Sequence, residues 1–172
     1  MEKPYIVCYM MASIDGRIDC EMTGRLPGVE SYYPVLEELD LPTTVSGRIT
    51  AELEMALPGK FSSETHTPYG KAGFSKKAEA KGYEVVLDSK GTLLWNRETD
   101  AAKPHLILTS ENVSKEYLDY LDTRNISWIA VGKGQVDVKS SRDPCQGVWR
   151  KKNGTGGRTS YEYRVFNSRA CG

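Results

Sequence analysis

Short apolar runs rich in strand-forming residues alternate along this chain with segments of helical character. The apolar runs cover residues 5–12, 105–108 and 127–131, and residues 43–46 (TTVS) are a further short strand candidate. The segments with helical spacing or helix-capping residues cover 31–40, 48–57 and 114–124. Strands that alternate with helices are typical of an α/β fold with a mostly parallel central sheet and flanking helices. Ligands bind such sheets at the carboxyl ends of the strands, so the residues after each run are the first candidates for a site.

The segment that begins at Ser114 has the clearest helix signal. Ser114 is a favourable N-cap, and Val113 and Leu118 stand where a hydrophobic staple forms. Tyr117, Leu118 and Leu121 share one helical face. We expect this face to pack on the sheet.

Three further segments carry expectations about the fold. Residues 5–12 lack polar alternation, which favours a buried strand. Residues 83–87 and 92–95 are strand candidates on either side of a turn at 88–91, a pattern that predicts a hairpin. Residues 58–81 are rich in Gly, Pro, Ser and Lys and are expected to form a loop.

Charge divides the chain near residue 138, although its formal net charge is zero. Residues 139–172 contain eight Lys or Arg and two Asp or Glu, a net charge of +6, whereas residues 1–138 carry a net charge of −6. The tail also contains no Leu, Ile or Met, the residues that core-facing elements use. We predict an incomplete α/β domain over 1–138 and an irregular basic tail over 139–172.

The composition argues against several classes of protein. Charged residues make up 27% of the chain and ten tyrosines are present, which is a globular composition. No apolar run approaches the roughly 18 residues of a membrane span. Four irregularly spaced cysteines and a start without a secretory signal favour a cytoplasmic protein with reduced thiols. No zinc-ligand spacing and no regular basic-aromatic pattern occurs, so neither a metal site nor a nucleic-acid partner is expected.

Polar residues follow three of the predicted strands. They are Ser13 and Asp15 after the first, Gly47, Arg48 and Thr50 after the second, and Thr109 and Ser110 after the third. Each group has an ordinary structural explanation, because Asp-Gly favours a turn and hydroxyl residues cap helices. Glycine and arginine at a helix start also suit a phosphate. Their shared position at the carboxyl edge of one sheet favours a single site.

Taken together, these residues resemble the reductase domain of riboflavin biosynthesis, the RibD C-terminal family, which shares the dihydrofolate reductase fold. The stretches that carry the resemblance are 11–18 (MASIDGRI), 44–52 (TVSGRITAE), 108–110 (LTS), 117–121 (YLDYL) and 126–132 (ISWIAVG). They occur in the family's order over about residues 3–138. The resemblance implies a three-layer sandwich and an NADPH-dependent oxidoreductase similar to 5-amino-6-(5-phosphoribosylamino)uracil reductase.

The resemblance also implies roles for the candidate residues. Gly47, Arg48 and Thr50 would line the NADPH phosphates, and Thr109 and Ser110 would lie by the adenosine end. Ser13 and Asp15 would lie near the nicotinamide and a pyrimidine ribosylamine or pterin-like substrate. Family members are commonly homodimers, so a homodimer is a possible assembly.

The tail departs from the family's pattern, which continues with further strands and a glycine-rich loop around the cofactor pyrophosphate. We expect residues 139–172 to result from a shifted reading frame, with the sheet's last strands missing or aberrant. In the shifted frame Trp149 encodes Gly, Lys151 and Lys152 encode Lys or Arg, and Glu162 encodes Asn or Ser. These are the residues that the family has at those positions. DNA codons that are incompatible with the shifted peptide would exclude this explanation.

Two functions from different classes follow from these observations. The first is a reductase of the riboflavin-biosynthesis or dihydrofolate reductase type, which this tail would leave impaired. The alternative is a catalytically impaired fragment or a non-enzymatic anion-binding protein, whose basic tail contacts anionic surfaces.

Overall fold

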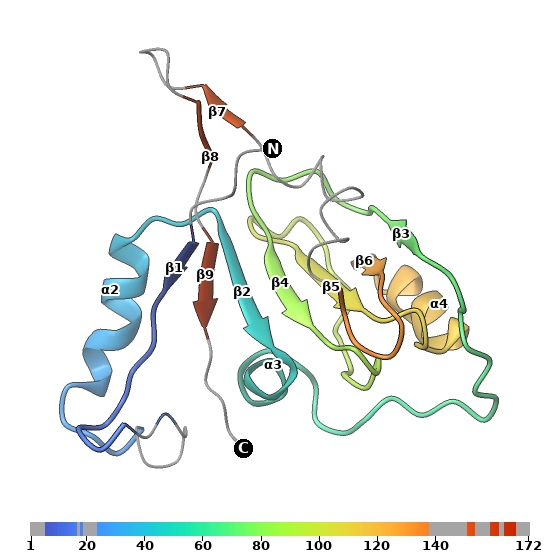
Figure 1. The fold of residues 1–172 in the computed structure, drawn as a ribbon, viewed down its shortest axis with the longest axis horizontal. Helices are drawn as coiled ribbons and strands as arrows, with labels where there is room; N and C mark the ends of the chain where they lie inside the picture. Colours follow the sequence, from blue (N-terminus) through green and yellow to red (C-terminus); the bar gives the residue numbers. More distant parts are fainter. Residues whose placement is uncertain are drawn as a thin grey trace.

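The computed structural model describes residues 6–16, 18 and 24–137, and the backbone of residues 151–153, 159–161 and 164–167. Within this part of the chain, a seven-stranded sheet has the order β1-β9-β2-β4-β5-β6-β3 (Figure 1). All neighbouring strands are parallel except β3 and β6. The strands are β1 (Ile6–Cys8), β2 (Thr43–Gly47), β3 (Gly73–Ser75), β4 (Glu84–Leu87), β5 (His105–Thr109), β6 (Ser127–Ala130) and β9 (Arg164–Asn167). The prediction of an α/β fold with a mostly parallel sheet is confirmed.

Helices form where capping and spacing predicted them. They are the α-helices α2 (Tyr32–Glu38), α3 (Arg48–Glu54) and α4 (Lys115–Thr123); the 3-10 turn η1 (Val29–Ser31), which directly precedes α2, was not predicted. Pro34 lies in the first turn of α2, where a missing N–H costs nothing. Ser114 caps α4, since its hydroxyl accepts a hydrogen bond of 3.2 Å from the N–H of Tyr117. In the described part of the chain, no helix is long and apolar enough to cross a membrane.

One face of the sheet carries the larger apolar cluster. Val86, Ile107 and Trp128 point from β4, β5 and β6 toward Leu118 and Leu121 of α4. Ala51 of α3 joins the same cluster. The predicted apolar face of α4 is therefore buried as expected.

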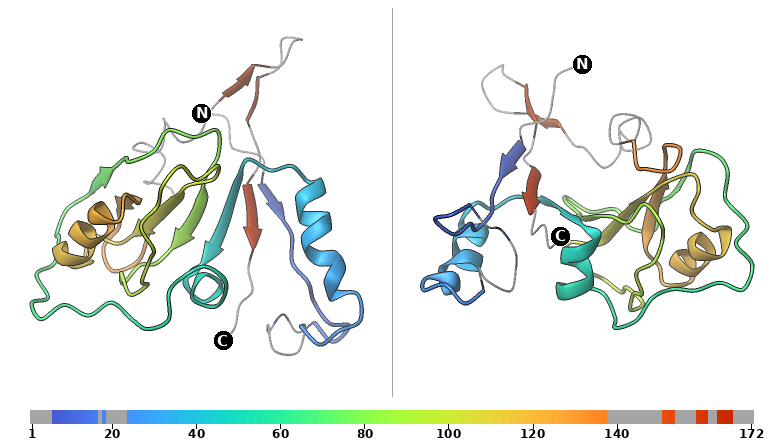
Figure 2. Two further views of the ribbon diagram at one scale, coloured as in Figure 1. Left: turned by 180° about the vertical axis from the view of Figure 1, so that it is seen from behind. Right: turned by 60° about the horizontal axis from the view of Figure 1, so that its bottom comes forward.

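The opposite face carries a second cluster formed by alternate residues of the same strands. Val85, Leu106 and Ile129 belong to it, and Ala80 and Val136 pack against it from loops. Figure 2 shows α2, α3 and α4 on one side of the sheet. Among the described residues no helix packs on this second cluster, so the third layer of the expected sandwich is not found there.

Three local expectations were wrong. Residues 92–95 do not form a hairpin with β4, because both neighbours of β4, β2 and β5, are parallel to it. Strand β1 is short and Ile6 is 46% exposed, so the first apolar run is not a buried strand. The predicted loop 58–81 contains the antiparallel edge strand β3.

The basic tail contributes strands that the sequence pattern did not predict. Strands β7 (Lys151–Asn153) and β8 (Thr159–Tyr161) form an antiparallel pair. Strand β9 lies between β1 and β2 and is parallel to both (Figure 1). The tail is therefore not wholly irregular, and it supplies one strand of the main sheet.

The turn after β4 is organised by the buried side chain of Asp88. Its carboxylate accepts hydrogen bonds from the backbone N–H groups of Gly91, Thr92 and Leu93 at 3.2, 2.7 and 3.0 Å. The Tyr117 hydroxyl donates a fourth, at 3.3 Å. Gly91 has a positive φ of 66°, and a Cβ there would lie 2.5 Å from Tyr117 and Val113. These contacts explain why 92–95 folds inward rather than pairing with β4.

Gly82 allows the chains that lead into β2 and β4 to approach each other. A Cβ on Gly82 would lie 1.6 Å from the carbonyl oxygen of Pro42. We therefore expect Gly82→Ala to lower the free energy of unfolding by about 3 kcal/mol or more, since rigid backbone must move. Urea denaturation measures the change. Gly47→Ala is the control. Nothing lies within 4 Å of a Cβ placed at Gly47, so this substitution should lower the free energy of unfolding by only about 1 kcal/mol.

Tyr117 makes the stability of the fold sensitive to high pH. Burial raises the pKa of its hydroxyl well above the usual value of 10, and the Asp88 carboxylate adds to the increase. The neutral hydroxyl therefore stabilises the fold fully below about pH 10, and this stabilisation is lost as the pH rises toward the folded-state pKa.

We expect this tyrosine to steepen the fall in stability above about pH 10 by up to about 1.4 kcal/mol per pH unit. Urea denaturation between pH 9 and about pH 12 would show a shallower fall for Tyr117→Phe than for the unaltered protein. Tyr33→Phe is the control, because Tyr33 is 48% exposed. Equal slopes for all three proteins would contradict the prediction.

Candidate functional site

The three predicted polar segments follow parallel strands. Residues 13–15 lie beyond β1, residues 47–50 pass from β2 into α3, and residues 109–110 end β5. Since β1, β9, β2, β4 and β5 run in the same direction, these segments lead from the same edge of the sheet (Figures 1 and 2). The side chains differ, however, in whether a ligand could reach them.

Ser13 and Asp15 form an exposed turn. The Ser13 hydroxyl donates to the Asp15 carboxylate. The N–H of Gly16 closes the turn by donating to the Ser13 carbonyl oxygen at 2.9 Å. Ile14, between them, is fully exposed. The turn expected from Asp15-Gly16 is confirmed, with Asp15 exposed and Ser13 half-buried.

Gly47 and Arg48 lie at the start of α3. Gly47 is the N-cap residue in extended conformation, and no side chain caps the helix. Arg48 is about one third exposed and forms an ion pair with Glu52 one turn later. Thr50 is 1% exposed, so its side chain belongs to the interior. Of the three predicted residues in this segment, only Gly47 and Arg48 are accessible at the surface.

Thr109 and Ser110 face the interior of the protein. Both are almost completely buried, and their hydroxyls donate to the carbonyl oxygen of Ser89 at 3.4 and 2.7 Å. That carbonyl belongs to the turn organised by Asp88. These hydroxyls therefore join the ends of β4 and β5 and are not directed at a ligand.

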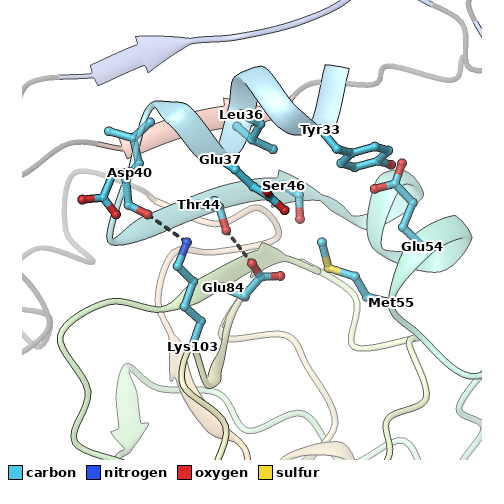
Figure 3. A pocket seen from close by; sticks show the side chains of 11 residues that line it. Tyr33, Leu36, Glu37, Asp40, Thr44, Ser46, Glu54, Met55, Glu84 and Lys103 are labelled. Atoms are coloured by element: carbon cyan, nitrogen blue, oxygen red, sulfur yellow. Dashed lines mark hydrogen bonds between the residues drawn. The ribbon is translucent and has the colours of Figure 1, made fainter. Parts of the chain in front are cut away.

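A cavity of about 450 Å³ lies between α2 and one face of the sheet, reaching from the amino ends of β2 and β4 to the end of α3 (Figure 3). Its floor is polar and comes from two neighbouring strands. Thr44 and Ser46 point into it from β2, and Glu84 points into it from β4. Thr44 and Glu84 are register partners, and the Thr44 hydroxyl donates to Glu84 Oε1 at 3.1 Å. A cavity of this size can hold a small organic molecule.

Acidic residues surround the same cavity. Glu37 reaches into it from α2, and Glu54 lies at the end of α3 (Figure 3). With Asp40 and Glu84, these two residues make four carboxylates in the described lining. Among the described residues of the lining, Lys103 is the one cationic group, and its ammonium donates to the Leu41 carbonyl oxygen at 2.8 Å. The described part of the lining therefore carries more acidic than basic side chains.

None of the seven predicted site residues lines this cavity, although Ser46 directly precedes Gly47. One signal in the sequence could have revealed its floor. Thr44 and Ser46 are separated by two positions on a strand, so their side chains share a face. Glu37 and Glu84 carry no such signal, because only the tertiary fold brings α2 and β4 together.

A metal ion does not suit the described residues, which contain no group of three His, Cys, Asp or Glu placed to hold one.

No protein-family model matches the sequence, and a search of curated proteins gives no significant match. The site must therefore be judged on its own geometry.

Ser110 should contribute to stability. We expect Ser110→Ala to lower the free energy of unfolding by about 1 to 2 kcal/mol, because a buried hydrogen bond is lost. Thermal or urea denaturation would measure the change. Ser63→Ala is a matched control, since Ser63 donates a comparable hydrogen bond at an exposed position and should change stability by less than about 0.5 kcal/mol. Equal effects of the two substitutions would show that Ser110 has no such structural role.

Proposed function

We propose that the chain is an NADPH-dependent reductase of the riboflavin-biosynthesis type, with a dihydrofolate reductase-like fold. It would transfer hydride to a pyrimidine ribosylamine or pterin-like substrate. The observation that carries the proposal is the passage of residues 46–50 from the parallel strand β2 directly into α3. The segment combines the family's Ser-Gly-Arg-Ile-Thr motif with an approachable edge of a parallel sheet.

The residues present fit NADPH in part. Arg48 is accessible, and the space beside Gly47 is open, with nothing within 4 Å of a Cβ placed there. These two residues would hold phosphate oxygens, and Arg48 would exchange part of its contact with Glu52 for them. The hydroxyls of Thr109 and Ser110 do not fit direct binding, since the Ser89 carbonyl oxygen accepts from both. They would act by fixing the end of β5.

Asp15 is exposed and Ser13 is half-buried, and the turn that they form suits contact with substrate. The Asp15 carboxylate accepts from Ser13, and the same carboxylate can accept an N–H or O–H group of a substrate. NADPH, when bound, supplies the hydride, whereas the protein contributes orientation and the exclusion of water. The acidic cavity is a poor site for phosphate, so we assign the anionic groups of cofactor and substrate to the Arg48 side of the edge.

We further propose that the tail results from a shifted reading frame and leaves the chain a poor reductase. The loop expected to surround the cofactor pyrophosphate has no counterpart in its sequence. Backbone N–H donors of that kind contribute much of the affinity for phosphate groups. Sequencing the encoding DNA tests the shifted frame independently of any enzyme assay.

Titration with NADPH tests the cofactor assignment. Quenching of tryptophan fluorescence should reveal binding, and Arg48→Ala should weaken it about tenfold, the effect of losing a charged hydrogen bond. Lys60→Ala is the control, because Lys60 is exposed and lies outside the proposed site. The absence of quenching up to about 1 mM NADPH, or equal affinities of the two variants, would contradict the proposal. NADPH oxidation at ordinary enzymatic rates would contradict the impairment alone.

A further inference from the structure

Helix α2 lies at the margin of the molecule and is attached mainly at its two ends (Figures 1 and 2). Tyr32 is the one buried residue of the helix, and Leu41, just beyond the other end, is buried as well. At the first end, the Tyr9 ring stacks on the Tyr32 ring with centroids 4.8 Å apart, and the Tyr9 hydroxyl donates to the Tyr32 carbonyl oxygen at 3.1 Å. At the second end, the Lys103 ammonium donates to the Leu41 carbonyl oxygen at 2.8 Å. The helix thus has one buried side chain and one hydrogen bond at each end.

Between these two ends, most of α2 faces solvent or the cavity. Tyr33, Val35 and Leu39 are exposed although they are apolar, and Leu36 is half-buried. The cavity of about 450 Å³ separates this stretch from the floor formed by β2 and β4 (Figure 3). Helix α4, in contrast, buries three side chains in the larger apolar cluster. Because elements with few buried contacts open at low free energy, α2 can open at a far lower cost than α4.

The backbone at the two ends determines which end can lift. Leu41 leads into β2, which begins at Thr43 and is paired on both sides. The Tyr32 end is preceded only by the short turn η1 and by Gly28, which has a positive φ of 91°. Asp40, at the other end, has a positive φ of 42°, which is uncommon for a residue other than glycine. Since hinges are a few residues at the ends of elements, the Tyr32 end can lift while Asp40 lies at the pivot.

From these observations we propose that α2 is a hinged lid over the cavity. The structure shows its closed position, which the contact between Tyr9 and Tyr32 holds. In the open position the Tyr32 end lifts, the helix turns about Asp40, and the floor of the cavity meets solvent while the sheet and α4 stay folded. Ser46, which is buried on that floor, becomes accessible only then. The lid does not depend on the proposed reductase activity, because no residue assigned to cofactor or substrate lies on α2.

Hydrogen exchange of the full chain measures the opening. We expect protection factors of the amides at 36–39 to be at least about a hundredfold lower than those at 120 and 121 in α4. Tyr9→Phe removes the hydroxyl and should speed exchange in α2 about fivefold. Tyr9→Ala also removes the stacked ring and should speed it at least about twentyfold. Tyr69→Phe is the matched control and should leave exchange in α2 unchanged, since the Tyr69 hydroxyl has no hydrogen bond to the described residues.

Labelling of Ser46→Cys with a maleimide tests whether the opening exposes the cavity. In the Tyr9→Ala background this thiol should react faster by the same factor as exchange in α2. Ser127→Cys is the matched control, because Ser127 is also buried but lies on β6, which β4 and β5 separate from β2. Its reaction should be equally slow in both backgrounds. Mass spectrometry of peptides assigns the labelled cysteine, and circular dichroism establishes that each variant is folded.

Three results would overturn the lid. The first is protection of α2 equal to that of α4. The second is equal acceleration of both helices by Tyr9→Ala, because α2 would then open only when the whole protein unfolds. The third is unchanged labelling of Ser46→Cys despite faster exchange in α2, since the helix would then fray without opening the cavity. If Ser46→Cys does not fold, the exchange measurements alone decide whether α2 opens separately.

Discussion

The buried carboxylate of Asp88 is the interaction on which the rest of the described structure depends. Burying a carboxylate away from solvent costs free energy unless hydrogen-bond donors surround it. Here three consecutive N–H groups and the Tyr117 hydroxyl do so. The Trp95 indole in turn donates to the Tyr117 hydroxyl at 3.2 Å. One side chain thereby ties the end of β4 to α4 and to the inward-folded segment 92–95.

The same turn determines what the carboxyl edge of the sheet can offer a ligand. Ser89 follows Asp88, and its carbonyl oxygen accepts the hydroxyls of Thr109 and Ser110. Polar residues at the end of β5 therefore serve the fold. Accessible polar groups remain at the start of α3 and in the turn after β1. A ligand at this edge would contact Arg48 and Asp15 rather than the hydroxyls of β5.

Local signals predicted most of the helices and strands. Ser114 and the apolar face of α4 are read from neighbouring residues, and that helix formed as expected. The predicted hairpin failed because 92–95 has the composition of a strand, yet Asp88 captures the N–H groups at its start. The cavity escaped prediction because α2, β2 and β4 meet there only through long-range pairing. The burial of the Thr109 and Ser110 hydroxyls likewise depends on the Ser89 carbonyl oxygen, which lies 20 and 21 residues earlier in the chain.

The placement of β9 has a consequence for the order in which the chain can assemble. In the described structure β1 pairs with β9 alone, and β9 separates it from β2 (Figure 1). More than 150 residues therefore lie between the two partners of the first strand pair, and closing so long a loop slows folding. On a ribosome, strands β2, β4, β5 and β6 can associate while β1 still waits for its neighbour to be synthesised. The N-terminal strand is thus among the last parts to be secured, and ribosome-bound intermediates would leave it open to chaperones and proteases.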